Sequence, residues 1–167
     1  MKSQEWKWGL LIGSVNLIWL LVSWLLGWHG SGIGRFQVAI VLGFFISFVG
    51  FVFAFRSITR EEPETTFAEG LRLGAVIAAI SGLLTAAGWA LYLGAINPGM
   101  SDYLVSEVRA HYTTAGIPAE KVELIAADAK SAFGLKAYTI KGGIGAFVMG
   151  IIYSAVIMGV IKWQQRR

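Results

Sequence analysis

Four long apolar runs alternate with polar connections along the chain, and the last of these connections is much longer than the others. A hydrocarbon core about 30 Å thick requires about 20 residues of helix at a rise of about 1.5 Å per residue. Each run meets this length, and charged residues occur only at its very ends. We therefore predict an all-α integral membrane protein with transmembrane helices at about residues 9–28, 36–55, 71–96 and 142–163.

The long connection carries a second pattern of its own. The tripeptide Asn-Pro-Gly at 97–99 cannot continue a helix, and Gly116 followed by Pro118 reads as a helix stop and a new start. We predict an extramembrane helical hairpin over about residues 100–134, with an apolar face on each arm. Those faces can pack on each other, on the ends of the spans, on the lipid interface or on a partner.

Small residues recur at every fourth position of the third run, and the fourth run repeats the pattern. They are Gly70, Gly74, Ala78, Gly82, Ala86, Ala90 and Gly94 on the third span, and Gly142, Ala146, Gly150 and Ser154 on the fourth. Such faces let transmembrane helices approach closely. We expect them to mediate helix packing inside a four-helix bundle, and a homodimer seam is the alternative.

The composition supports a membrane protein. Of 167 residues, 56% are hydrophobic and 14% are charged, whereas soluble domains contain about 25% charged residues. Residues 1–167 form one predicted membrane domain, and the first run is too long for the apolar region of a signal peptide. The chain has no cysteine, so disulfides and thiolate sites are excluded.

The positive charges indicate an orientation. With four spans, both termini lie on one side, and that side carries Lys2, Lys7, Arg56, Arg60, Arg72, Lys162, Arg166 and Arg167. The opposite side carries Arg35, Arg109, Lys121, Lys130, Lys136 and Lys141, mostly spread through the long connection. The positive-inside rule weights short loops and span flanks, so both termini are predicted to be cytoplasmic. This placement explains the net charge of +4 without nucleic acid.

Glu69 is the one carboxylate close to the start of a span. It follows Thr66 by three residues, which is the spacing of a capping box. A proton or cation site is the functional alternative, and the capping box explains the residue more simply.

Ionisable residues inside a span usually mark transport or catalysis, and these spans offer only hydroxyl and amide groups. The candidate ligand-binding residues are Asn16, Ser47 and Ser81 in the spans, and Asp102, Glu107 and His111 on the hairpin. Asn16 is expected to form an interhelical hydrogen bond, and a solvated helix face explains the hairpin residues equally well. No catalytic residue, metal site or cofactor is expected, because His29 and His111 lack a ligand pattern and nucleophile or phosphate-binding motifs are absent.

Three segments carry a family resemblance: "FRSITREEPETTFAEGLRLG", "INPGMSDYL" and "AGIPAEKVE". Together they resemble the DUF4199 family of bacterial integral membrane proteins, a domain of unknown function. The likeness covers most of the chain in the order of its four spans and long third loop. It implies the same architecture in a bacterial inner (cytoplasmic) membrane, with the hairpin in the periplasm, and it supplies no catalytic residue.

We expect a non-enzymatic binding, accessory or assembly component that recognises membrane lipids, a lipid-linked molecule or another membrane protein. A small oligomeric transporter or channel subunit is the alternative. A polar tunnel lined by Asn16, Ser47 and Ser81 would favour transport, whereas a closed bundle with a lipid-filled groove beside the hairpin would favour binding. The hairpin itself either recognises a partner or caps the bundle.

Overall fold

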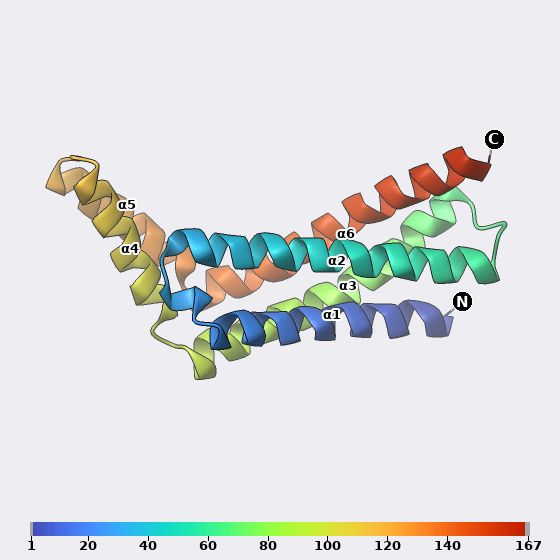
Figure 1. The fold of residues 1–167 in the computed structure, drawn as a ribbon, viewed down its shortest axis with the longest axis horizontal. Helices are drawn as coiled ribbons and strands as arrows, with labels where there is room; N and C mark the ends of the chain where they lie inside the picture. Colours follow the sequence, from blue (N-terminus) through green and yellow to red (C-terminus); the bar gives the residue numbers. More distant parts are fainter. Residues whose placement is uncertain (1, 166–167) are drawn as a thin grey trace.

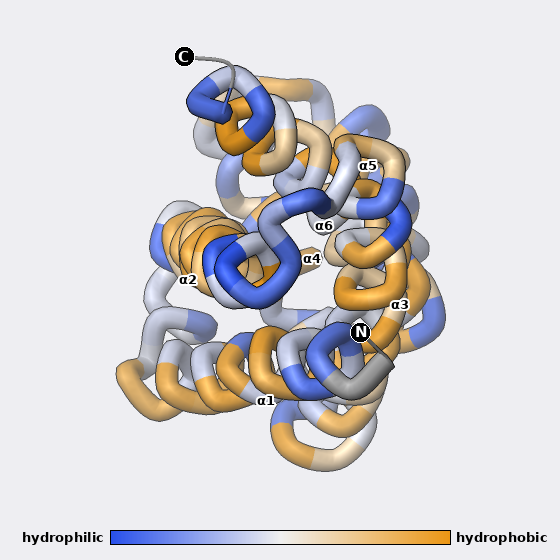
Figure 2. Tube along the Cα trace, turned by 90° about the vertical axis from the view of Figure 1, so that its right-hand side faces the viewer, coloured by the Kyte–Doolittle hydropathy of each residue, from blue (hydrophilic) through white to orange (hydrophobic). Residues whose placement is uncertain are grey.

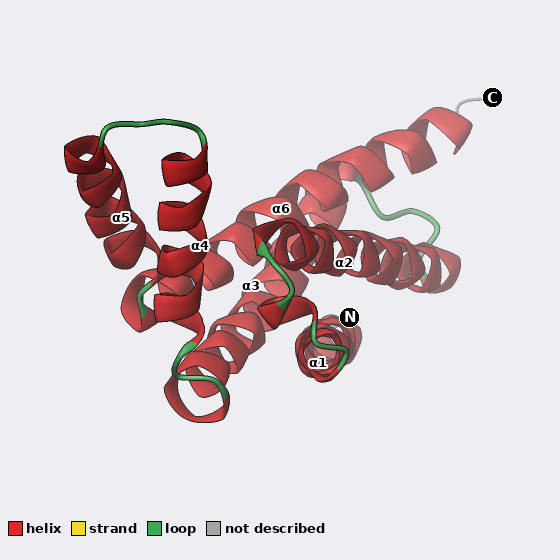
Figure 3. Ribbon diagram, turned by 60° about the vertical axis from the view of Figure 1, so that its left-hand side comes forward, coloured by secondary structure: helices red, strands yellow, loops and turns green. Residues whose placement is uncertain are grey.

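The computed structural model describes residues 2–165, which form helices and turns only (Figure 3). The α-helices are α1 (Lys2–Leu25), α2 (Ile33–Glu61), α3 (Phe67–Leu91), α4 (Met100–Thr114), α5 (Ala119–Phe133) and α6 (Leu135–Gln165). A 3₁₀ turn, Trp28–Gly30, joins α1 to α2, and a π-helical turn, Tyr92–Ile96, ends α3.

Four of these helices are long and apolar enough to cross a membrane: Gln4–Leu25, Ile33–Glu61, Phe67–Ile96 and Leu135–Gln165. The prediction of four such helices is confirmed, but their ends differ from the predicted bounds. The second helix runs to Glu61 and not to residue 55, and the third begins at Phe67 and not at residue 71. The first helix stops at Leu25 and not at residue 28, because Gly27 adopts a left-handed conformation with φ 74°. The last helix begins at Leu135, directly after Gly134, and not at residue 142. Residues 135–141, which precede the apolar run, are compatible with a helix and extend it.

The four long helices surround a common axis. Seen along that axis, α3 lies next to α1 and α6, and α2 lies diagonally opposite α3 (Figure 2). The first and last described residues lie at one end of the bundle, and α4 and α5 extend from the other (Figure 1). Arg166 and Arg167, two of the cations used to predict orientation, lie outside the described residues.

The small residues of α3 and α6 lie where these two helices meet. A Cβ atom added to Gly150 would lie 2.5 Å from the Cβ of Ala78, and one added to Gly82 would lie 3.0 Å from the carbonyl oxygen of Gly143. Side chains at these positions therefore cannot be larger without moving a helix. The close contact does not extend to Gly94, which is exposed and whose added Cβ would meet Leu135 only at 3.9 Å.

Helix α1 packs on α3 in the same manner. Added Cβ atoms at Gly9 and Gly13 would lie 2.7 Å from Ile80 and 2.6 Å from Leu84. Helix α2 approaches α1 closely at Gly50 but meets α3 and α6 through the large side chains of Phe51 and Phe55. Buried side chains form two clusters. The terminal cluster consists of Ile12, Phe51, Ala54, Phe55, Ile58, Leu73, Ile77, Ala78, Tyr153, Ile157 and Met158. The loop cluster consists of Phe36, Tyr92, Leu93, Met100 and Leu104.

The predicted breaks in the long connection are confirmed. The chain leaves α3 before Asn-Pro-Gly, Gly116 adopts φ +75°, and Pro118 precedes α5. Helices α4 and α5 lie side by side, and Arg109 of α4 donates to Glu123 of α5 at 2.8 and 2.9 Å (Figure 3).

Helix α4 packs on the end of the bundle. It buries Met100, Leu104 and Val105. The hydroxyl oxygen of Tyr103 accepts a hydrogen bond from the backbone N–H of Gly32 at 2.8 Å. Helix α4 therefore covers the connection between α1 and α2.

Candidate functional site

A cavity of about 240 Å³ lies between α1, α2, α3 and α6. Phe51 and Tyr153 of the terminal cluster line one part of its wall, and Phe36 of the loop cluster lines another. The cavity is thus bounded by a packed cluster at each end. It exists because α1, α3 and α6 approach through small residues, whereas the large side chains of α2 hold that helix away from α3.

Three predicted ligand-binding residues, Asn16, Ser47 and Ser81, line this one cavity. The amide nitrogen of Asn16 donates to Ser47 Oγ at 2.8 Å, which links α1 to α2, and to the carbonyl oxygen of Ile12 at 3.0 Å. Ser47 in turn donates to the carbonyl of Gly43 at 3.0 Å. Asn16 therefore forms an interhelical hydrogen bond while its side chain also lines the cavity.

The other three predicted residues lie outside the cavity, on α4. Asp102 and His111 are exposed, and the ring of His111 lies 5.3 Å from that of Tyr112. Glu107 is half-buried near Gly32. These three side chains do not reach the cavity, because the face of α4 that packs on the bundle carries Met100, Leu104 and Val105.

Glu69 takes part in the predicted capping box. Its backbone N–H donates to Thr66 Oγ1 at 3.2 Å, and its carboxylate accepts from the backbone N–H of Thr66 at 2.8 Å. The capping box is confirmed. Its side chain is exposed at the start of α3, away from the cavity lining.

A buried chain of hydrogen bonds around His29 closes the cavity toward α4. His29 is 2% exposed. Its Nε2 lies 2.9 Å from Ser23 Oγ, and its Nδ1 lies 2.5 Å from the hydroxyl oxygen of Tyr92. Ser23 also donates to the carbonyl oxygen of Leu20 at 3.0 Å, and Asn97 Nδ2 donates to the Tyr92 oxygen at 2.8 Å.

The tautomer of His29 follows from the hydrogen-bond donors of this network. We assign the tautomer that gives every group a partner: Ser23 donates its proton to the carbonyl of Leu20 and accepts from Nε2–H of His29. Nδ1 is then an acceptor and receives the O–H of Tyr92, whose oxygen accepts from Asn97. Every member is satisfied with a neutral imidazole. Burial also lowers the pKa of His29 from 6.5 to about 4, since the charged form loses hydration.

Sequence reasoning missed His29 as part of a site. The residue lies among glycines and tryptophans between two spans, a context in which most histidines are solvated. Its partner Tyr92 faces inward from the π-helical turn of α3, which the backbone bond from Asn97 N to Tyr92 O closes at 2.7 Å. Such turns inside helices are frequent at functional sites, but the local sequence does not predict one here.

The described residues offer no cluster of three or more His, Cys, Asp or Glu that could hold a metal ion. Ser23 and His29 line the cavity and contact each other, yet the assigned tautomer makes Ser23 the acceptor and His29 the donor. A serine nucleophile requires the opposite direction, with the imidazole accepting the serine proton.

Comparison with known proteins found one family. A family model described as a protein of unknown function (DUF4199) matches residues 7–162. No curated protein and no solved structure matches the chain.

Proposed function

The chain belongs to the DUF4199 family of proteins of unknown function, as its sequence resemblance predicted, and we propose that it is a non-enzymatic membrane protein that binds a lipid or lipid-linked molecule in its cavity. The observation that carries this proposal is an uncharged, mostly apolar cavity of about 240 Å³ inside a bundle of four long apolar helices.

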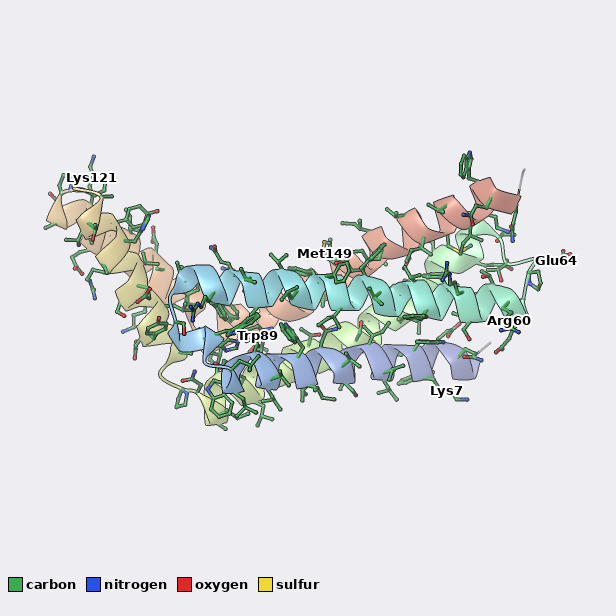
Figure 4. The ribbon with its side chains drawn as sticks, viewed as in Figure 1. Lys7, Arg60, Glu64, Trp89, Lys121 and Met149 are labelled. Atoms are coloured by element: carbon green, nitrogen blue, oxygen red, sulfur yellow. The ribbon has the colours of Figure 1, made fainter. Side chains whose placement is uncertain are left out.

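Insertion into a membrane is supported by what the four helices expose. Large apolar side chains such as Leu25, Phe45 and Leu83 are more than half exposed, which is favourable only beside lipid or a partner. Charged residues such as Lys7 and Arg60 lie near one end of the bundle, and Lys121 lies beyond the other (Figure 4). We place the end with the termini in the cytoplasm and α4 and α5 in the periplasm of a bacterial inner membrane.

The size and walls of the cavity suit the apolar end of a membrane molecule. A dry cavity of about 150 Å³ already holds benzene, and drug-sized ligands occupy about 300–1,000 Å³. The cavity therefore fits one ring or a short stretch of chain. Aromatic side chains make up much of its wall, among them Trp19, Phe36, Phe51, Trp89, Tyr138 and Tyr153.

Transport, the alternative function, requires a continuous polar path. Asn16, Ser47 and Ser81 supply polar atoms in the cavity, but large apolar side chains pack at both of its ends. Binding therefore has more support than passage. The direction of the hydrogen bond between Ser23 and His29 likewise supports a protein that acts without covalent chemistry.

The test is native mass spectrometry of the protein purified in mild detergent without delipidation. We expect at least one retained lipid-like molecule per chain. Replacing Ala146, which lines the cavity, by phenylalanine should fill the space and abolish retention. The matched variant Ala87→Phe alters an exposed position of α3 and should retain the molecule. Equal retention by both variants would show that the bound lipid lies outside the cavity.

A further inference from the structure

The hydrogen-bond donors of the cavity wall indicate which class of ligand the cavity can bind. Most side chains that line the cavity and carry an N–H or O–H already donate to the protein. Trp19 donates to the carbonyl oxygen of Ala39 at 2.8 Å, and Tyr153 donates to that of Phe44 at 3.1 Å. Asn16, Ser23, Ser47, Ser81, Thr85 and His29 are likewise committed to protein acceptors.

Two side chains of the cavity wall carry a hydrogen-bond donor that has no acceptor in the described part of the protein. Among the hydrogen bonds of the described residues, none involves Nε1–H of Trp89 or the O–H of Tyr138, although both side chains line the cavity. An unpaired donor in an apolar space is unfavourable. A ligand acceptor placed in the cavity would satisfy both.

The two donors belong to one group of aromatic rings. The ring centroids of Trp89 and Tyr138 lie 4.8 Å apart. Phe36 lies 6.3 Å from each of them. Figure 4 shows Trp89 in the half of the bundle that carries α4 and α5. The planes of Trp89 and Tyr138 meet at 65°, and those of Phe36 and Trp89 at 85°. A ligand ring can make offset or edge-to-face contacts with such a group.

The charge of the cavity lining further limits the class of ligand. Among the described residues that line the cavity, none is Asp, Glu, Lys or Arg, and the tautomer assigned above leaves His29 neutral. A charged group would therefore lose its hydration without gaining a counter-ion. The part of the ligand inside the cavity is uncharged.

We propose that the cavity binds the head of a membrane quinone or a chemically equivalent lipid: an uncharged ring whose carbonyl oxygens accept from Trp89 Nε1–H and Tyr138 O–H. This inference rests on the proposed function, because it names the class of ligand for the same cavity. A quinone ring fits the available volume, and its isoprenoid or alkyl tail can leave the bundle between helices into the surrounding lipid.

Two probes with the same tail test the proposal on the full chain in mild detergent. Decylubiquinone carries carbonyl acceptors, whereas decylbenzene carries a ring and a tail without them. Calorimetric titration should give tighter binding of decylubiquinone. The Tyr138→Phe and Trp89→Phe variants should each weaken its binding by about 2- to 10-fold, the range of one hydrogen bond, and leave decylbenzene binding nearly unchanged.

The ratio of the two affinities separates recognition from damage to the fold. A variant that only loosens the cavity weakens both probes equally, which would contradict the proposal. Tyr138→Phe should also leave the thermal stability of the ligand-free protein unchanged or higher, because it removes an unpaired donor. Tyr112→Phe on α4 and Trp6→Phe at an exposed position are the matched controls and should bind both probes as the wild type does.

The outcomes also separate this inference from the proposed function. Equal affinity of the wild type for both probes would mean that the cavity binds ligand but that water serves the two donors, and the quinone assignment would be wrong. Failure of both probes to bind, together with no retained lipid in native mass spectrometry, would overturn the lipid-binding function itself.

Discussion

His29 lies in the connection between α1 and α2. It joins the end of α1, through Ser23, to the end of α3, through Tyr92, which is 63 residues away. Local sequence could not have predicted this role, because it depends on a π-helical turn and on the covering α4. Asn16 is the opposite case. A single amide within an apolar span needs a partner wherever it is buried, so the interhelical bond to Ser47 was predictable.

Burial of neutral His29 makes stability depend on pH. Its pKa is about 4 in the folded protein and 6.5 when unperturbed. Between these values the unfolded chain binds the extra proton, so stability is fully present above about pH 6.5 and falls as the pH drops toward 4. The loss amounts to about 2–4 kcal/mol at the lower limit. Thermal unfolding in detergent at pH 7.5, 6 and 4.5 measures it.

The control for this prediction is His111, which is exposed on α4. His29→Gln should lower stability at neutral pH and flatten the pH dependence, whereas His111→Gln should leave the wild-type profile unchanged. A His29→Gln variant that keeps the full wild-type pH dependence would show that another group is responsible.

At the scale of elements, the helix breaks and the capping box were predictable because a few adjacent residues determine each of them. Asn-Pro-Gly at 97–99, Gly116 and Pro118 end or start a helix wherever they occur. The small-residue pattern predicted that α3 and α6 have faces for close packing, but periodicity alone left open which helix each face meets. In the structure they meet each other.

The contact between α3 and α6 gives a prediction about stability. A Cβ at Gly150 would lie 2.5 Å from Ala78 Cβ, so Gly150→Leu should force the helices apart and destabilise the protein by about 1–3 kcal/mol, as overpacking does. Gly145 lies on the same helix with no atom within 4 Å of an added Cβ. Gly145→Leu should therefore leave the melting temperature in detergent nearly unchanged. Equal effects of the two substitutions would contradict the close contact.

Helix α4 acts as a cap on the bundle in the structure. It buries Leu104 and Val105 and binds Gly32 through Tyr103. The ion pair between Arg109 and Glu123 is exposed. It raises the pKa of the Arg109 guanidinium and lowers that of the Glu123 carboxyl, but exposed pairs contribute little to stability. Helix α4 thus accounts for the capping alternative. Recognition of a partner by the exposed face of α5 is a separate proposal.

At the scale of the whole molecule, the number of long helices and their order followed from hydrophobicity, and the cavity did not. A cavity is the volume left between elements, and here it results from close packing of α1, α3 and α6 combined with the bulky face of α2. Each pattern is visible in the sequence. Their combined effect on volume depends on the diagonal placement of α2 relative to α3, which periodicity does not determine.

The central claim, that this cavity holds a membrane molecule, is tested most directly by an experimental density map of the protein purified without delipidation. We predict one continuous, elongated density between the four long helices, whose ring contacts Trp89 and Tyr138 and whose tail leaves the bundle sideways, between two helices. A cavity that contains only separate water-sized peaks, or that has closed by movement of α2 onto α3, would contradict the account.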